Sequence, residues 1–321
     1  MVPAFPLSAC NSRDVKLFGC QFCLLDPTNC ITTPNCTRPF LESLTSAYLA
    51  AQRAGDPSLL TTIASPGPNL IYLENNLATP LTTSTLATPL RIDFARTIHD
   101  PDQCAAFAEV IAATDERPHV IHTRFVLALN DGVVDGNGAR LELQLVESVV
   151  TNAGDWLFNA TGTLELNAGE GEGAWGEIPE GERAAERGAV QALGDAYFDR
   201  FGDVSVVVPW AAEPCYRLEG GLPARGEVVE GECVMVWPST IVVPYRRYVV
   251  DVVLGAVSVF VGFPGLDRTQ GQAAMPDSHL FRVEGGKIKF CHTASACVVD
   301  GCGLNGTTFG KRGLRPVRLR V

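Results

Sequence analysis

The sequence lacks the features that define several large classes of protein. No apolar run reaches the roughly 18 residues of a membrane-spanning helix, so we expect no membrane span. Positive charge is scarce, because 25 lysines and arginines face 36 aspartates and glutamates and leave a net charge of −11. This balance argues against a nucleic acid or an anionic membrane as partner. Charged residues make up only 19% and hydrophobic residues 46%, which excludes a disordered chain.

The motifs of several enzyme classes are also missing. There is no G-x-S-x-G nucleophile turn and no G-x-x-x-x-G-K-[ST] phosphate loop. No G-x-G-x-x-G segment follows a predicted strand and opens a helix. The five histidines are scattered, without the H-E-x-x-H spacing of zinc enzymes. We therefore expect a protein that uses neither a metal ion nor another cofactor.

Cysteine, by contrast, is plentiful. Five of the eleven cysteines fall within the first 36 residues, in a segment with little core of its own, which predicts a disulfide-linked cap. A zinc site at Cys20, Cys23, Cys30 and Cys36 is the rival interpretation, but the gap between its two pairs is short for a zinc ribbon or finger. Cys104 is expected to pair with an N-terminal cysteine. The odd total leaves one thiol, most simply a buried free cysteine.

Three Asn-x-Ser/Thr sequences mark possible glycosylation sites at Asn35, Asn159 and Asn305. Together with the cysteines, they indicate a secreted protein or one of the secretory pathway. The first residues carry neither a basic stretch nor an apolar stretch. We therefore expect the signal peptide to be absent from this sequence.

The length of 321 residues favours two domains as a starting point. A stretch rich in glycine and glutamate separates two halves that each open with a helical pattern and continue as strands, which is typical of an α+β protein. The predicted divisions are a cap at 1–38, a first unit at 39–161, a linker at 162–182, a second unit at 183–303 and a basic tail at 304–321.

The two halves have similar patterns of predicted elements. Tyr48 and Tyr197 lie in the opening helix of each half, and Tyr72 and Tyr216 in the strand after it, which indicates a divergent internal repeat. The first half is predicted to contain helices at 39–54, 57–60 and 102–110, with Asp100 as N-cap of the last, and strands at 70–76, 120–129 and 141–151. The second is predicted to contain a helix at 189–201 and strands at 215–220, 245–254, 256–263 and 280–292, the last broken by the turn at 284–287.

Some of these residues carry a resemblance. A helix that ends in Gly55-Asp56-Pro57-Ser58, followed by Tyr72-Leu73-Glu74-Asn75, resembles the SnoaL-like, ketosteroid-isomerase-like cone fold, also named for nuclear transport factor 2. The segments 154–161, 246–251, 255–260 and 277–287 are similar to an uncharacterised family of fungal secreted proteins with two such units. The resemblance covers roughly residues 39 to 300. It implies tandem cone-like units, each with helices packed on a curved antiparallel sheet.

Cone-fold relatives include isomerases, cyclases, dehydratases, epoxide hydrolases and plain binding modules, so the fold alone does not set the function. Their shared device is an apolar cone that holds one or two polar groups, as in ketosteroid isomerase, whose carboxylate base and oxyanion site are a known example. The resemblance implies a cofactor-independent isomerase or cyclase that acts by acid/base catalysis on a hydrophobic small molecule. A polyketide or terpenoid of fungal secondary metabolism fits this description.

The catalytic candidates are in the second unit. His279 and His292 lie at similar distances from the Gly285-Gly286 turn, so we expect them to pair across a hairpin. Asp251 would complete an acid/base group, and Arg247, on the same strand face as Asp251, would stabilise negative charge. A histidine that is hydrogen-bonded at a strand end is the structural alternative for His279.

The binding candidates are Tyr72, Tyr216, His122 and Arg124. The tyrosines suit core packing with the hydroxyl at the rim of a cone, or donation of a hydrogen bond to a ligand. Arg124 is more readily explained as the partner of Glu147 in a structural ion pair.

Another candidate is the segment of Asp93 and Arg96, which flank Phe94 in a stretch predicted to be irregular. This stretch is either a lid or a solvated loop. Two other functions remain open for the chain. One is a non-catalytic secreted protein that binds a ligand or a partner, including a second copy of itself. The other is a carbohydrate-active enzyme, which needs two carboxylates across a cleft and aromatic residues such as Trp175, Trp210 and Trp237.

Overall fold

The computed structural model describes residues 36–129, 141–171, 173–212, 215–224, 228–229, 232–233, 240–264 and 274–298. These residues all belong to one compact unit, Cys36–Val321. Most of the predicted cap, the basic tail, Asn35, Asn305 and Trp237 lie outside the described residues. No helix among the residues that the structure describes is long and apolar enough to cross a membrane.

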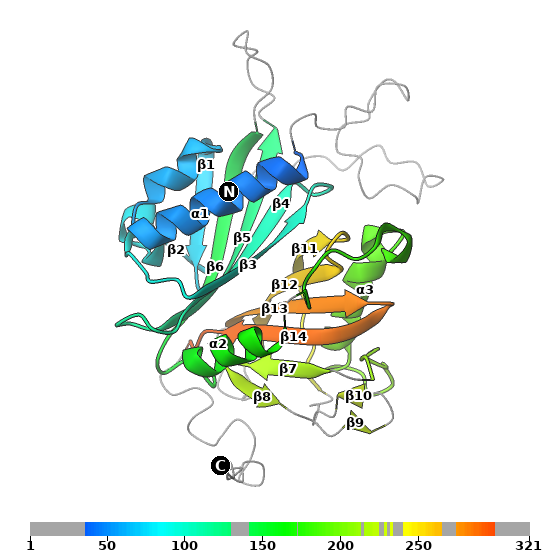
Figure 1. The fold of residues 1–321 in the computed structure, drawn as a ribbon. Helices are drawn as coiled ribbons and strands as arrows, with labels where there is room; N and C mark the ends of the chain where they lie inside the picture. Colours follow the sequence, from blue (N-terminus) through cyan, green and yellow to red (C-terminus); the bar gives the residue numbers. More distant parts are fainter. Residues whose placement is uncertain are drawn as a thin grey trace, which may run out of the picture. The chain divides into compact units, whose positions relative to one another are not determined.

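The first half of the described chain is a six-stranded sheet with one long helix (Figure 1). The strands lie in the order β2-β1-β6-β5-β4-β3, and all neighbours are antiparallel except β1 and β6. The elements are α1 (Arg38–Ala54), η1 (Pro57–Thr62), β1 (Ser65–Glu74), β2 (Leu77–Ala78), η2 (Leu81–Thr83), η3 (Thr85–Ala87), β3 (Phe94–Asp100), β4 (Ala105–Ala112), β5 (His119–Leu129) and β6 (Leu141–Thr151).

The second half has a sheet with the corresponding strand order, β8-β7-β14-β13-β12-β11. Its one parallel pair is β7 with β14, in the same position as β1 with β6. The elements are α2 (Ala160–Gly169), η4 (Glu180–Glu182), α3 (Arg187–Asp199), β7 (Tyr216–Glu219), β8 (Leu222–Ala224), the separate pair β9 (Val228–Val229) and β10 (Glu232–Cys233), β11 (Arg247–Asp251), β12 (Ala256–Phe263), β13 (Met275–Glu284) and β14 (Lys287–Ser295).

The α+β class is therefore confirmed, but both large sheets are mixed rather than purely antiparallel. In Figure 1, α1 lies across one face of the first sheet. Thr37 caps α1 by accepting a hydrogen bond from the Phe40 amide, and Gly55 ends it in a left-handed conformation with φ 65°. The apolar face of α1, with Leu41 and Leu44, packs into the core of the first half.

In the second half, α3 packs against the central strands. Val190, Tyr197 and Phe198 of the helix are buried with Val257 and Phe281 of the sheet, among other residues. The faces of the two sheets that lie away from α1 and α3 contribute to a third core. Its larger members are Ile98, Phe107, Ile111, Val249, Phe260 and Leu280.

The outer strands β3 and β11 meet in a reciprocal arrangement. Asp251 accepts a hydrogen bond from the His99 amide at 2.9 Å and pairs with Arg38 at the start of α1. Asp100 accepts one from the Val250 amide at 2.9 Å and pairs with Arg187 at the start of α3 at 2.8 Å. Each half thus supplies a carboxylate to a backbone amide of the other half. Two of the predicted roles are wrong here: Asp100 does not cap a helix, and Asp251 does not face His279.

Two predicted elements are wrong. The helix expected at 102–110 is strand β4, in which every residue is buried. A strand covered on both faces shows no polar alternation, so its apolar residues also fit a helical spacing. The linker expected at 162–182 instead contains most of α2, and its Glu170 and Trp175 contact the sheets.

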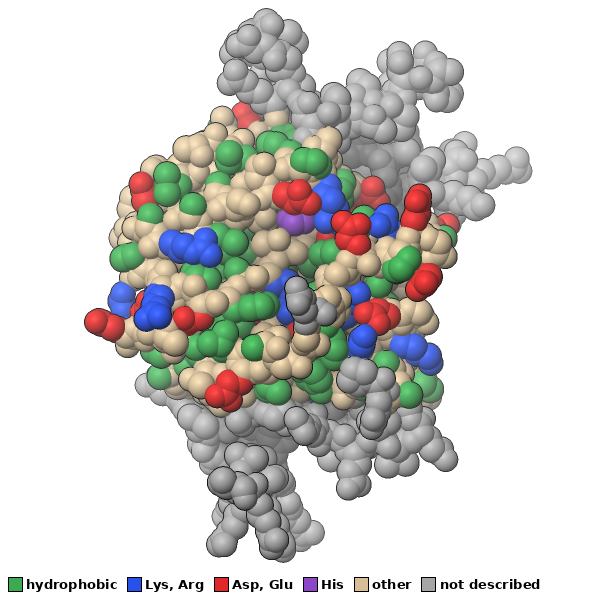
Figure 2. All heavy atoms as spheres, viewed as in Figure 1, with side chains coloured by type: hydrophobic (Ala, Val, Ile, Leu, Met, Phe, Trp, Pro, Cys, Tyr) green, Lys and Arg blue, Asp and Glu red, His purple; other side chains and the backbone are tan. Residues whose placement is uncertain are grey.

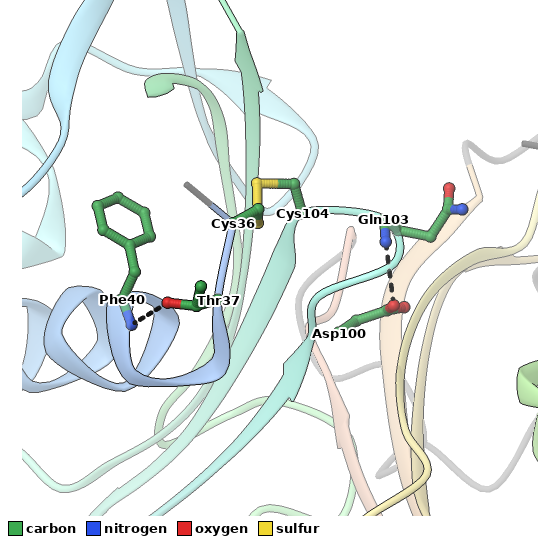
Figure 3. Close-up of a disulfide and its surroundings, with 6 residues drawn as sticks. All are labelled: Cys36, Thr37, Phe40, Asp100, Gln103 and Cys104. Atoms are coloured by element: carbon green, nitrogen blue, oxygen red, sulfur yellow. Dashed lines mark hydrogen bonds between the residues drawn. A yellow bond between two sulfur atoms is a disulfide. The ribbon is translucent and has the colours of Figure 1, made fainter. Parts of the chain in front are cut away.

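A disulfide joins Cys36 to Cys104, with the two Cα atoms 5.6 Å apart (Figure 3). This confirms that Cys104 pairs with an N-terminal cysteine. Cys215 and Cys297 are also disulfide-bonded. Cys291 in β14 is buried and free, so the described chain does contain a buried thiol without a disulfide.

Candidate functional site

The strongest candidate site lies inside the second half, between α3 and its sheet. His279 of β13 faces α3 and is 3% exposed. Its ring packs against Phe198, Tyr197 and Phe281, at centroid distances of 4.8, 5.1 and 5.8 Å. The site is therefore an imidazole surrounded by aromatic rings, two of them from the helix.

The partner of His279 is Asp277, two residues earlier on the same strand face. Asp277 Oδ1 lies 3.5 Å from Nδ1 of His279 and accepts a hydrogen bond from the Ser295 hydroxyl at 2.7 Å. Among the described residues, neither ring nitrogen of His279 has a hydrogen-bond partner. Buried polar groups are rarely left in this state, and among the described residues His279 alone has two such buried atoms.

Burial shifts the ionisation of this group. It raises the pKa of Asp277 to about 7 and, together with the charge of Arg217, holds the pKa of His279 well below its usual range. It also raises the pKa of the Tyr197 hydroxyl and of the Cys291 thiol. At neutral pH the site therefore holds a neutral imidazole next to a carboxyl group whose pKa is much closer to 7 than that of an exposed aspartate. Such a cluster of perturbed groups in one interior is typical of functional sites.

The first half has no such pair at the corresponding place. Thr123 and His279 each lie opposite the fourth residue of the preceding strand, and Ile121 and Asp277 each lie opposite the sixth. The Tyr48 hydroxyl and Thr123 Oγ1 are 2.8 Å apart, in the interior where the second half has Tyr197 and His279. The titratable pair is thus found in the second half only, as far as the described residues extend.

The predicted grouping of His279 with His292, Asp251 and Arg247 is wrong. His279 lies opposite Thr293 and His292 opposite Leu280, so the two histidines are on opposite faces of the sheet. Asp251 is engaged with Arg38 and the His99 amide, as described above.

The predicted ion pair between Arg124 and Glu147 is confirmed. Arg124 donates two hydrogen bonds to Glu147, at 2.9 and 3.1 Å, from the neighbouring strand. Arg247 reaches across from β11 and pairs with the same carboxylate at 2.6 Å. Arg247 therefore joins the second half to the first half and does not lie beside His279.

A second polar cluster lies between the two sheets. Glu109, fully buried in β4, bonds Nδ1 of His292 at 3.0 Å and Arg96 of β3 at 2.6 Å. Glu170 bonds Nε2 of His292 at 2.5 Å and Arg96 at 2.9 Å. We call Arg96, Glu109, Glu170 and His292 the inter-sheet cluster. Arg96 lies on a regular strand, so the irregular lid predicted around Phe94 is wrong.

The other three binding candidates, Tyr72, Tyr216 and His122, do not lie in one site. Tyr216 bonds Glu170 of the inter-sheet cluster, and His122 lies 3.5 Å from Glu109 and bonds the Ser278 hydroxyl at 3.1 Å. Tyr72 instead belongs to the core beneath α1. Tyr72 and Tyr216 thus face different sides of their sheets, so the predicted equivalence of these two tyrosines is wrong.

The inter-sheet cluster predicts a pH dependence of stability. Burial disfavours the imidazolium of His292, but Glu109 and Glu170 outweigh burial and raise its pKa to about 9. Because the pKa in the unfolded chain is about 6.5, this contribution is complete below pH 6.5 and is lost as the pH rises to 9. We expect the free energy of unfolding to fall by about 3 kcal/mol over this interval.

Urea unfolding at several pH values measures this effect. The His292→Gln variant serves as the control, because its glutamine does not titrate and its stability should change much less between pH 7 and 9. Equal pH profiles of the two proteins would show that His292 is not charged in the folded state.

Comparisons with known proteins give one partial match. Residues 183–295 match the model of a family described as Domain of unknown function (DUF8021). No curated protein and no solved structure matches the chain. The match covers the second half from α3 to β14, with His279 and His292, but not α2 or η4, and it assigns no activity to these residues.

Sequence reasoning identified His279 but missed Asp277 and Tyr197 as its neighbours. The predicted strand began only at residue 280, whereas β13 begins at Met275, so that Asp277 and His279 share one face of it. Tyr197 was noted only as a repeated helix residue. No group of three or more potential metal ligands is found among the described residues.

Proposed function

We propose that the second half carries the active site of a cofactor-independent isomerase or cyclase that acts on a hydrophobic small molecule. One observation supports this most directly: the buried ring of His279 has no hydrogen-bond partner among the described residues and lies 3.5 Å from Asp277. With its Nδ1 toward Asp277, the ring has its other nitrogen available to act on a bound ligand. The aromatic rings around His279 favour an apolar ligand body.

The proposed chemistry is proton transfer at a carbon next to a carbonyl group. The neutral ring of His279 removes the proton from this carbon, and Asp277 stabilises the resulting imidazolium. The electron pair moves to the carbonyl oxygen, where a hydrogen bond from the Tyr197 hydroxyl stabilises the enolate. Return of the proton to a different carbon gives the isomer and restores the neutral imidazole.

The first half has a structural role in this proposal, because Thr123 and Ile121 replace the acid/base pair there. The two halves are then tandem cone-like units, of which one has kept the chemistry. The common strand order and the corresponding parallel pairs support this interpretation. Access to His279 requires α3 to move away from the sheet, since Tyr197 and Phe198 of α3 lie against the ring.

The test uses 5-nitrobenzisoxazole, an apolar compound that reports on a base in an apolar site. When a base takes its carbon-bound proton at C3, the electron pair forms the nitrile, the N–O bond breaks and the oxygen leaves as a coloured nitrophenolate. We expect the protein to accelerate this reaction above buffer, with a rate that rises through pH 7 as Asp277 ionises. The Asp277→Asn and His279→Gln variants should each lose about 100-fold in rate.

Thr123→Val is the matched control, because it changes the corresponding position of the first half and should leave the rate unchanged. Circular dichroism and the thermal midpoint confirm that each variant is folded. If the wild-type protein is no faster than buffer, or if the rate survives both substitutions, the acid/base proposal is wrong.

A non-catalytic secreted binding protein is the second candidate. The observation that favours it is the aromatic packing around His279, since a filled interior needs no substrate. It predicts no acceleration of the probe by any variant. The carbohydrate-active alternative finds less support, because Trp210 is buried and the face of Trp175 carries the guanidinium of Arg96 at 4.1 Å. Secretion and glycosylation at Asn159 remain predictions that mass spectrometry of the natural protein would test.

A further inference from the structure

The carboxylate of Glu170 is bound much as a protein binds a free carboxylate ligand. Its Oε1 accepts hydrogen bonds from Nε2 of His292, at 2.5 Å, and from the Tyr216 hydroxyl. Its Oε2 accepts from the Trp175 indole at 2.6 Å and from Arg96 at 2.9 Å. Four donors thus converge on one carboxylate whose side chain is only 1% exposed.

The side chains around this carboxylate are of the kind that bind an anion. Without Glu170, the inter-sheet cluster contains the guanidinium of Arg96, the imidazole of His292 and the single carboxylate Glu109. A monovalent anion there would restore the negative charge that, together with Glu109, favours the imidazolium of His292 and raises its pKa. Three of the four donors come from β3, β7 and β14, whereas Trp175 and Glu170 itself come from the segment between α2 and η4.

The walls of the site are aromatic. The Tyr216 and Trp175 rings lie 4.9 and 6.2 Å from the ring of Phe290, and Trp175 lies 5.2 Å from His292. Trp175 and Tyr216 are half-buried rather than fully enclosed. Next to the donors there is thus apolar surface that an organic carboxylate can contact.

Glu170 lies at the C-terminal end of α2, and two glycines with left-handed backbone conformations follow it. It follows the last residue of α2, and both Gly171 and Gly173 have positive φ, 88° and 85°. A side chain in the left-handed region is strained, and no atom lies within 4 Å of a Cβ added at either position, so backbone conformation rather than packing favours glycine here. The backbone conformation of this segment therefore helps to position the Glu170 carboxylate next to its donors.

We propose that the donors around Glu170 form a binding site for a small organic carboxylate, and that Glu170 is its internal ligand. An external monocarboxylate of acetate size occupies the same place when the Glu170 side chain is absent or withdrawn. This site lies on the face of the second sheet opposite to His279 and does not depend on the function proposed there.

The test is chemical rescue of the Glu170→Ala variant by acetate at pH 6.5. We expect the variant to have a lower thermal midpoint than the wild type, and sodium acetate to raise it in a saturable way. A ligand at ten times its Kd multiplies the folding equilibrium constant by about 11. Sodium chloride at equal ionic strength should not do so. Carbon-13-labelled acetate should show a nuclear Overhauser effect to the His292 ring of the variant.

Glu165→Ala is the matched control, since Glu165 is an exposed glutamate of the same helix. It and the wild type should show only the general salt effect of acetate. The proposal is overturned if acetate and chloride affect Glu170→Ala alike, or if acetate stabilises all three proteins equally. It is also overturned if Glu170→Ala fails to fold in acetate, because a filled site should restore the missing interactions.

Discussion

Replacement of Arg96 by methionine is expected to lower the free energy of unfolding by about 3–5 kcal/mol. Arg96 pairs with both Glu109 and Glu170, and both carboxylates are almost completely buried. Without the guanidinium, two buried negative charges share the single cation His292. Their desolvation is then no longer compensated, and the loss exceeds what a surface ion pair contributes.

Urea unfolding at pH 6.5 measures this loss, and Arg91→Met is the matched control. Arg91 precedes the same strand, but its side chain is 74% exposed and its contact with Asp93 is 3.9 Å long. We expect a change below about 1 kcal/mol for it. Similar values for the two variants would mean that the inter-sheet cluster contributes little to the stability of the fold.

Removal of the Cys36–Cys104 disulfide is expected to cost about 4 kcal/mol. The bond closes a loop with a sequence separation of 68, and loop closure of this length strongly restricts the unfolded chain. The double variant Cys36→Ser/Cys104→Ser changes this one bond and leaves the other disulfides oxidised. Its thermal midpoint and urea midpoint should both fall.

Thr37→Ala is the comparison for this experiment. Thr37 follows Cys36 and caps α1, as Figure 3 shows, so its substitution affects the same segment without opening the loop. Loss of such a cap typically costs about 1 kcal/mol. If the double variant loses no more than Thr37→Ala, the disulfide does not restrict the unfolded chain as the loop-closure model assumes.

Local patterns in the sequence predicted a large part of the fold. The alternation in β5 and β6 gave their limits almost to the residue, and α1 ends at the predicted Gly55. The order of the strands could not be obtained in this way. The parallel pairs β1–β6 and β7–β14 join strands far apart in the chain, and no local pattern records them.

The wrong pairing of His279 with His292 has one physical cause. Glu284 pairs with Lys287 at the turn, and a regular hairpin continued from there would place His279 opposite His292. The register shifts near Val283, so that His279 lies opposite Thr293 instead. A shift of one residue exchanges the two faces of a strand. The sequence of the hairpin gave no sign of this bulge.

The inter-sheet cluster could not be predicted from the sequence, for a different reason. Arg96 and Glu109 lie opposite each other in the β3–β4 hairpin, but the sequence predicted a helix in place of β4, and Glu170 and His292 come from distant parts of the chain. Glu170 also lies in a glycine- and glutamate-rich stretch of the kind that composition assigns to loops. Only the tertiary fold brings its carboxylate into a buried position.

On the face of the molecule in Figure 2, acidic and basic side chains are interspersed, and neither sign forms a continuous field. This distribution agrees with the absence of a basic patch, of the kind that a nucleic acid would need, from the face shown.

The reciprocal bonds of Asp100 and Asp251 have a consequence for the behaviour of the protein at high concentration. The outermost strand of a sheet exposes backbone amides that can recruit a strand of another molecule and begin aggregation. In β3 and β11, the amides of His99 and Val250 are instead occupied by carboxylates of the opposite half. Each half thereby protects an edge strand of the other half from pairing with another molecule. Partial separation of the halves would expose the amides of both edge strands at the same time.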